Sequence, residues 1–87
     1  ARVVKELARL PGCAVFPSAA NFVLMELPAR LKAPRLVSAL RRQGILIRDC
    51  SQVPGLNDRS IRVAVRSRAD NDRLLRSLSA ILGTRGA

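Results

Sequence analysis

The stretch ILIRDCSQVPGLNDRSIRVAVR, which runs from Ile45 to Arg66, decides the fold. Two short apolar segments, residues 45–48 and 61–66, flank a polar loop that contains Pro54 and Gly55. Alternating apolar residues on either side of a Pro-Gly turn predict two β-strands. Because the connection is short, we expect these strands to pair in the antiparallel sense.

An arginine sits on each of the two predicted strands. Arg48 ends the first strand, and Arg62 lies near the start of the second, on the face opposite Ile61. A guanidinium binds a phosphate or carboxylate through paired N–H donors, so two arginines brought together beside a turn fit a substrate with two anionic groups. Structural readings stay open for both residues. Arg48 would pair with the adjacent Asp49 or be solvated at the strand end, and Arg62 would lie exposed on an edge strand.

The rest of the chain reads as support for this hairpin. Pro11-Gly12 stops the first predicted helix, and Gly44 is a natural end for the second. Ser67 begins the last helix, with Asp70 three residues later in the place of a capping-box acid. Helices are expected at residues 1–10, 34–43 and 68–82, and strands at residues 13–16, 22–27, 45–48 and 61–66.

This order of elements predicts the fold class. Residues 22–27 are apolar on both faces, so we expect a central strand that is at least partly covered on each side. The short connections favour a small two-layer α+β sandwich, in which a mostly antiparallel four-stranded sheet carries helices on one face. A chain of 87 residues allows one such domain, and residues 84–87 are expected to form a frayed tail.

The chain is strongly basic, with a formal net charge of +10. Such an excess indicates an anionic ligand, a polyanionic partner or an acidic partner domain. All but two of the basic residues are arginine, so a compositional bias also explains it. Nucleic acid is the less favoured partner, because Phe16 and Phe22 are the only aromatic residues and no basic helix of a DNA-reading kind is visible.

Several kinds of chemistry are excluded by composition. The chain has no His, Tyr or Trp and six carboxylates, so groups for general acid–base catalysis are nearly absent. Cys13 and Cys50 without any His cannot form a zinc site of standard spacing. Lys5 and Lys32, the only residues able to form a Schiff base, lack an active-site context. No run approaches the ~20 apolar residues of a membrane span, and no signal peptide is visible, so we expect a cytoplasmic protein.

Two segments resemble a known family. PSAANFVLMEL at residues 17–27 and GILIRDCSQVPGLNDRSIRVAVRSRADNDRLL at residues 44–75 are similar to the C-terminal small domain of threonine-phosphate decarboxylases. These enzymes belong to the histidinol-phosphate aminotransferase-like, fold-type-I pyridoxal-phosphate enzymes. The most specific part is residues 47–51 followed by 54–56. Residues 20–22 and 61–66 are shared more widely, so a histidinol-phosphate-type aminotransferase stays the alternative.

The resemblance implies an enzyme of cobalamin biosynthesis that decarboxylates L-threonine O-3-phosphate with pyridoxal phosphate (PLP). It implies that Arg62 binds the substrate carboxylate and Arg48 the substrate phosphate. The large domain with the Schiff-base lysine has no counterpart in this sequence, so we expect the chain alone to bind no cofactor and to be inactive. Residues 1–10 would then be the end of an inter-domain helix, and the whole enzyme a homodimer.

An alternative of another class stays open. In it the chain is a free-standing basic α+β module that binds an anionic ligand or nucleic acid. The first residue is not Met and lies inside a predicted helix, which favours a piece of a longer polypeptide over such a module.

Overall fold

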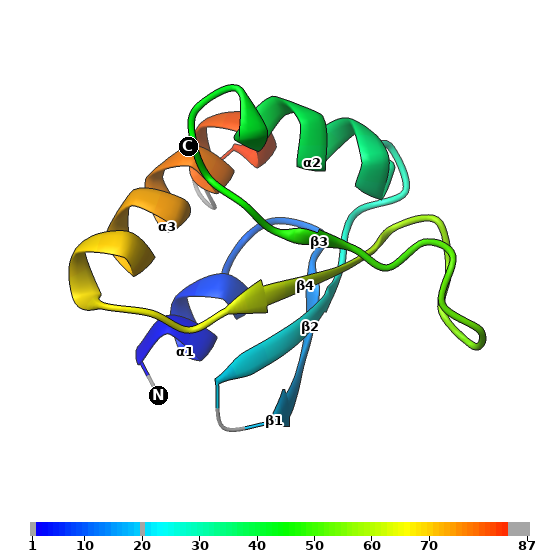
Figure 1. Cartoon of the computed structure of the whole chain (residues 1–87), viewed down its shortest axis with the longest axis horizontal. Coiled ribbons are helices and arrows are strands. Elements are labelled where there is room, and N and C mark those ends of the chain that lie inside the picture. The colour runs from blue at the N-terminus through cyan, green and yellow to red at the C-terminus, as the bar shows by residue number, and fades with distance from the viewer. Residues whose placement is uncertain (1, 20, 84–87) are drawn as a thin grey trace.

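The computed structural model describes residues 2–19 and 21–83, so the tail expected at residues 84–87 lies outside the described residues. The predicted order of elements is confirmed (Figure 1). The elements are α1 (Arg2–Ala8), β1 (Ala14–Ala19), β2 (Phe22–Glu26), α2 (Ala33–Arg41), β3 (Arg48–Asp49), β4 (Ser60–Ala64) and α3 (Arg68–Leu82).

The sheet has four strands in the order β1-β2-β4-β3, and each neighbouring pair is antiparallel. The expected central place of β2 is confirmed, and β4 is the other interior strand. The three helices pack on one face of this sheet, which is the predicted α+β sandwich. In the parts of the chain that the structure describes, no helix combines the length and apolar character of a membrane span.

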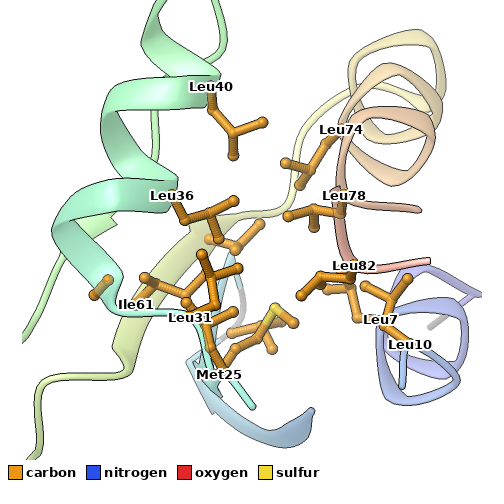
Figure 2. Close-up of a cluster of buried hydrophobic side chains, with 14 of the residues drawn as sticks. Leu7, Leu10, Met25, Leu31, Leu36, Leu40, Ile61, Leu74, Leu78 and Leu82 are labelled. Atoms are coloured by element: carbon orange, nitrogen blue, oxygen red, sulfur yellow. The ribbon is translucent and has the colours of Figure 1, made fainter. Parts of the chain in front are cut away.

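The core lies between the helices and one face of the sheet (Figure 2). Val23 and Met25 of β2 and Ile61 and Val63 of β4 are at most 2% exposed. Fully burying side chains of this size contributes roughly 1.5–3 kcal/mol each to folding. Because neighbouring strand residues point to opposite faces, this burial also turns Arg62 away from the core. The helices contribute Val3, Leu7, Leu36, Val37, Leu40, Leu74, Leu78 and Leu82.

The strand expected at residues 45–48 is wrong in its extent. Only Arg48 and Asp49 pair with β4, and residues 45–47 form no ladder. The N–H of Ile45 instead donates to the carbonyl of Leu40, which completes the end of α2. Ile45 and Ile47 still pack against the core. The alternating pattern at residues 45–47 therefore arises because Ile45 and Ile47 face the core, and not because these residues pair with a strand.

The three other strands also differ from the prediction at their ends, and β2 stops at Glu26, one residue early. β1 runs on to Ala19, because an edge strand accepts Pro17, which cannot donate to a ladder. The pairing of β1 with β2 shifts register between Pro17 and Ala19. β4 ends at Ala64, and the next N–H, that of Val65, donates to the carbonyl of Asn21 at 2.8 Å.

The bounds of α3 agree with the prediction, whereas α1 ends at Ala8 and α2 at Arg41, each two residues before the predicted end. The side chain of Ser67 accepts a hydrogen bond from the N–H of Asp70 at 3.2 Å, so the expected N-cap of α3 is confirmed. Gly83 follows α3, and Gly44 follows the last turn of α2 with a φ of +77°. A positive φ suits glycine because it has no Cβ.

Candidate anion-binding site

The β3–β4 ladder places Arg48 directly opposite Arg62. Cross-strand partners project to the same face of a sheet, so both side chains lie on the face away from the helices. We call this face the open face. Its residues on the four strands include Phe16, Phe22, Leu24, Glu26, Arg48, Ser60 and Arg62.

The loop between β3 and β4 sets this register. Asp49 ends β3, and one of its carboxylate oxygens accepts from the N–H of Ser51 at 2.8 Å. The predicted turn at Pro54-Gly55 is confirmed, since the N–H of Leu56 donates to the carbonyl of Val53 at 3.0 Å. Gly55 has a φ of +86°, as the third position of a type II turn requires.

The structure decides against the Arg48–Asp49 ion pair and against an edge-strand position for Arg62, whereas Arg48 is exposed at the sheet edge, as its solvated reading predicts. Arg48 and Asp49 are consecutive strand residues, so their side chains leave opposite faces of the sheet and form no ion pair. Arg62 is half-buried on an interior strand, not exposed on an edge. Among residues 2–19 and 21–83, no ion pair involves either Arg48 or Arg62. Arg48 and Arg62 therefore project from the same face of the sheet without a carboxylate partner in the described chain.

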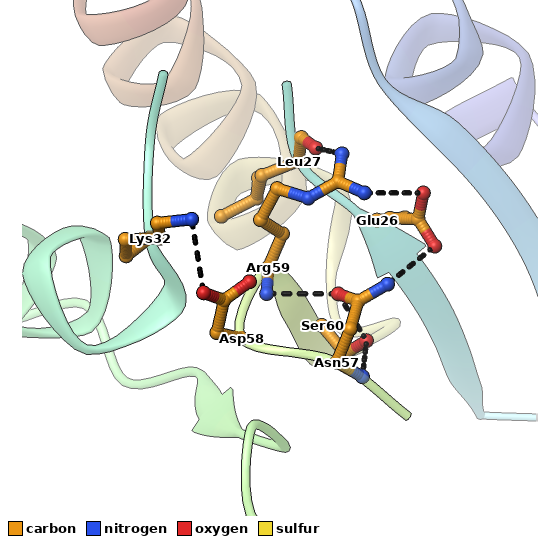
Figure 3. Close-up of polar contacts among 7 residues, drawn as sticks. All are labelled: Glu26, Leu27, Lys32, Asn57, Asp58, Arg59 and Ser60. Atoms are coloured by element: carbon orange, nitrogen blue, oxygen red, sulfur yellow. Dashed lines mark hydrogen bonds and ion pairs between the residues drawn. The ribbon is translucent and has the colours of Figure 1, made fainter. Parts of the chain in front are cut away.

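The carboxylate of Glu26 on the open face is already engaged (Figure 3). One of its oxygens lies 3.3 Å from a guanidinium nitrogen of Arg59, and the other accepts from the side-chain amide of Asn57 at 3.0 Å. Arg59 also donates to the carbonyl of Leu27 at 2.9 Å. These contacts attach the end of the β3–β4 loop to the end of β2. Because Glu26 is engaged in these contacts, it does not neutralise Arg48 or Arg62, and their charges are available to another anion.

Arg62 has an aromatic neighbour on the open face. Its Cζ lies 4.4 Å from the centroid of the Phe22 ring, within the range of a cation–π contact. Next to Arg62 along the sheet is a shallow hollow of about 260 Å³. It is lined by Phe16, Leu24, Met25, Glu26, Leu56 and Ser60. The open face thus combines two cations with apolar surface.

A second hollow of about 210 Å³ lies between the segment before β3, the end of β4 and the start of α3. Neither Arg48 nor Arg62 lines it. The guanidinium of Arg73, which does, donates to the backbone carbonyl of Gln43, and Asp70 places a carboxylate in the same hollow. Arg66 also lines this hollow, which therefore combines two cations with one carboxylate.

The chain's own nucleophiles lie elsewhere. Lys5 is on α1, and Lys32 forms an ion pair with Asp58 at 2.9 Å, so the two lysines of the sequence do not provide a Schiff base at the open face. Both cysteines are free. Burial raises the pKa of the Cys13 thiol, against the opposing charge of Arg30, and Cys50 is 4% exposed. The residues described here can bind and orient an anion, but they do not fit the attachment of PLP.

Sequence reasoning singled out the two arginines but not the residues around them. Phe22 was interpreted only as part of an apolar strand, and Asn57 and Arg59 only as loop residues. The contact of Phe22 with Arg62 depends on the β2–β4 register, for which the sequence carried no signal. The spacing Asn57-x-x-Ser60 before a strand could have suggested a polar turn.

The aminotransferase class I and II family matches residues 1–78. A threonine-phosphate decarboxylase of Salmonella typhimurium is 42% identical over 94% of this chain and 22% of its own length. A histidinol-phosphate aminotransferase of Thermoanaerobacter pseudethanolicus is 38% identical over 93% of this chain and 22% of its own length. The chain therefore spans about a fifth of the length of these curated relatives.

Comparison with solved structures shows the same similarity in three dimensions. A decarboxylase from Sulfurospirillum multivorans superimposes with a TM-score of 0.85 and 36% identity, covering 93% of this chain and 23% of that protein. Both the sequence match and the superposition extend over most of the chain. The chain belongs to the aminotransferase class I and II family, as a part related to threonine-phosphate decarboxylases and histidinol-phosphate aminotransferases.

Proposed function

We propose that residues 1–87 form the small C-terminal, substrate-binding domain of a PLP-dependent L-threonine-O-3-phosphate decarboxylase of cobalamin biosynthesis. The observation that carries this proposal is the cross-strand pair of Arg48 and Arg62 on the open face. A substrate with a carboxylate and a phosphate matches two adjacent cations. The 42% identity to the Salmonella decarboxylase supports the same reading.

The two arginines have different surroundings, and this suggests which anionic group of the substrate each one binds. Arg62 is half-buried on an interior strand and rests on an aromatic ring, so its guanidinium is the more fixed of the two. We assign it the α-carboxylate, whose orientation decides which bond at Cα breaks. Arg48 is exposed at the edge of the sheet, and we assign it the larger phosphate group. Binding energy from the phosphate would then help to position the reacting carbon.

The cofactor would come from the remainder of a longer protein. Homologues in this family depend on PLP, and the lysines of this chain do not lie at the open face. PLP held by a large domain would supply the electron sink for decarboxylation. The chain alone would then bind substrate anions weakly and release no carbon dioxide. We further propose a homodimeric, cytoplasmic parent enzyme.

A second candidate is the same domain of a histidinol-phosphate-type aminotransferase. The 38% identity to the Thermoanaerobacter enzyme over nearly the whole chain favours it. An arginine pair also suits its phosphorylated substrate and a carboxylate-bearing co-substrate. A free-standing module that binds nucleic acid is the third candidate, supported by the charge of +10 and by the exposure of Phe16 and Phe22 on the open face.

The test uses the full-length protein that contains this chain. Incubated with PLP and L-threonine O-3-phosphate, it should release carbon dioxide. Histidinol phosphate with 2-oxoglutarate, run in parallel, should give no transamination. Transamination without carbon dioxide would move the protein to the aminotransferase branch and keep the arginine pair. Salt-dependent retention of unrelated DNA, with neither activity, would favour the nucleic-acid module.

A further inference from the structure

We infer that Phe22 is a positioning residue that holds the guanidinium of Arg62 in place for the substrate carboxylate. The inference rests on the proposed function of Arg62. It concerns how that arginine is kept in a productive orientation before any ligand arrives.

The register of β2 and β4 creates the contact. Leu24 is the direct cross-strand partner of Arg62, and Phe22 is the partner of Ala64, so Phe22 is the diagonal neighbour of Arg62 on the open face. Diagonal neighbours are within reach of aromatic and long side chains. The Cζ of Arg62 lies 4.4 Å from the ring centroid.

Phe22 is poorly explained as a core residue. It is 37% exposed, whereas Val23 and Met25, its core-facing neighbours on β2, are at most 2% exposed. A large aromatic ring that stays on the surface of an interior strand gains only part of the free energy that burial offers. At this position the ring contacts the guanidinium of Arg62.

A cation–π contact holds an arginine without using its N–H donors. Arg59 shows the contrast, because its guanidinium donates to Leu27 and pairs with Glu26, which engages both of its terminal nitrogens. Within the described part of the chain, no hydrogen bond or ion pair engages the guanidinium of Arg62. The ring of Phe22 therefore restrains the group and leaves its donors for a carboxylate.

The neighbouring charge makes such a restraint useful. Arg48 is the direct cross-strand partner of Arg62, and like charges in this relation repel each other. An arginine side chain also has many rotamers, whose loss opposes binding. A ring that already holds the guanidinium lowers this cost, in the same way that preorganisation strengthens other binding sites.

The test compares Phe22→Leu, Phe22→Tyr and Arg62→Ala in the full-length protein with PLP, using L-threonine O-3-phosphate as the ligand. Phe22→Leu should raise KM by roughly two- to five-fold, the size of an exposed cation–π contact, with a smaller change in kcat. Phe22→Tyr keeps the aromatic face and should leave KM near the wild-type value. Phe16→Leu is the matched control, because Phe16 is 51% exposed on the same face and no arginine or lysine of the described residues lies over its ring.

Different failures have different meanings. If Arg62→Ala weakens binding but Phe22→Leu does not, the positioning role is wrong and the arginine site stands. Equal effects of Phe22→Leu and Phe16→Leu, or no rescue by Phe22→Tyr, would also overturn the positioning role, because either result indicates general packing. If Arg62→Ala itself leaves binding unchanged, the proposed function of the arginine fails, and the inference about Phe22 fails with it.

Discussion

Arg48 and Arg62 are direct cross-strand partners in the β3–β4 ladder, so the sheet holds two positive charges next to each other. Direct like-charge pairs destabilise a sheet by roughly 0.2–1 kcal/mol. An arrangement that costs folding energy and has no carboxylate partner in the described chain is typical of a binding site. An anion that bridges the two groups would remove the repulsion.

The first prediction concerns this repulsion. Arg48→Gln should raise the free energy of unfolding by about 0.2–1 kcal/mol at low ionic strength, measured by urea denaturation without ligand. The gain should shrink in high salt, which screens exposed charges. Arg35→Gln, an exposed position on α2, changes the net charge equally and is the control. Equal gains from both variants would mean that net charge is responsible, and not the pair.

The second prediction separates the roles of the two arginines in the full-length enzyme. Arg48→Ala should lower kcat/KM for L-threonine O-3-phosphate by roughly 10- to 150-fold, the value of a charged hydrogen bond. It should have little effect on L-threonine, which has no phosphate. Arg62→Ala should lower kcat/KM for both substrates, because both have the carboxylate. Steady-state kinetics with the two substrates provide the comparison. Loss of L-threonine use in Arg48→Ala would contradict the assignment of the phosphate.

The third prediction concerns the attachment of the β3–β4 loop. The side chain of Asn57 donates to Glu26 and accepts from the N–H of Arg59 and the hydroxyl of Ser60, which is 3% exposed. Asn57→Ala leaves these groups without their partner and should cost roughly 1–3 kcal/mol of stability, measured by chemical denaturation. Gln52→Ala, an exposed position in the same loop, should change stability by less than about 0.5 kcal/mol. A similar small effect for Asn57→Ala would show that water replaces the network.

The order of elements and the sheet type could be predicted because their signals are local. Pro11-Gly12, Gly44 and the Ser67 cap mark helix ends in any context, and the alternation of Ile61 and Val63 identifies a strand with one buried face. The turn at residues 54–55 then implies that Arg48 and Arg62 come near each other. The sequence did not predict which residues of the two strands pair directly, because that register depends on the conformation of loop residues 50–59.

The remaining features depend on contacts between distant residues. Residues 45–47 look like a strand because Ile45 and Ile47 face the core, but the backbone of Ile45 is used by α2. The place of Asn71 is a second case. Its side chain binds both the N–H and the carbonyl of Arg66, at 2.9 and 3.0 Å, and so joins the start of α3 to the segment after β4. The amphipathic pattern of a helix does not indicate that one of its polar residues is buried and hydrogen-bonded to the backbone of another segment.

The last prediction concerns acid pH. The Nζ of Lys32 lies 2.9 Å from a carboxylate oxygen of Asp58, and this hydrogen bond is the main reason that the pKa of Asp58 is below its ordinary value. A carboxyl with a lowered pKa in the folded state stabilises the fold above its unfolded pKa of about 3.9. That stability is lost as the pH falls through the folded pKa.

Asp58→Asn should therefore reduce the loss of stability between about pH 5 and pH 2, measured as the urea midpoint against pH. The effect should be small and weaker in salt, because the side chains of Lys32 and Asp58 are 56% and 60% exposed. The backbone carbonyl of Asp58 still accepts from the N–H of Ala33 at 2.8 Å, so the substitution leaves the loop attached. Lys32→Met should flatten the same part of the profile. An unchanged slope in both variants would show that other carboxylates govern acid unfolding.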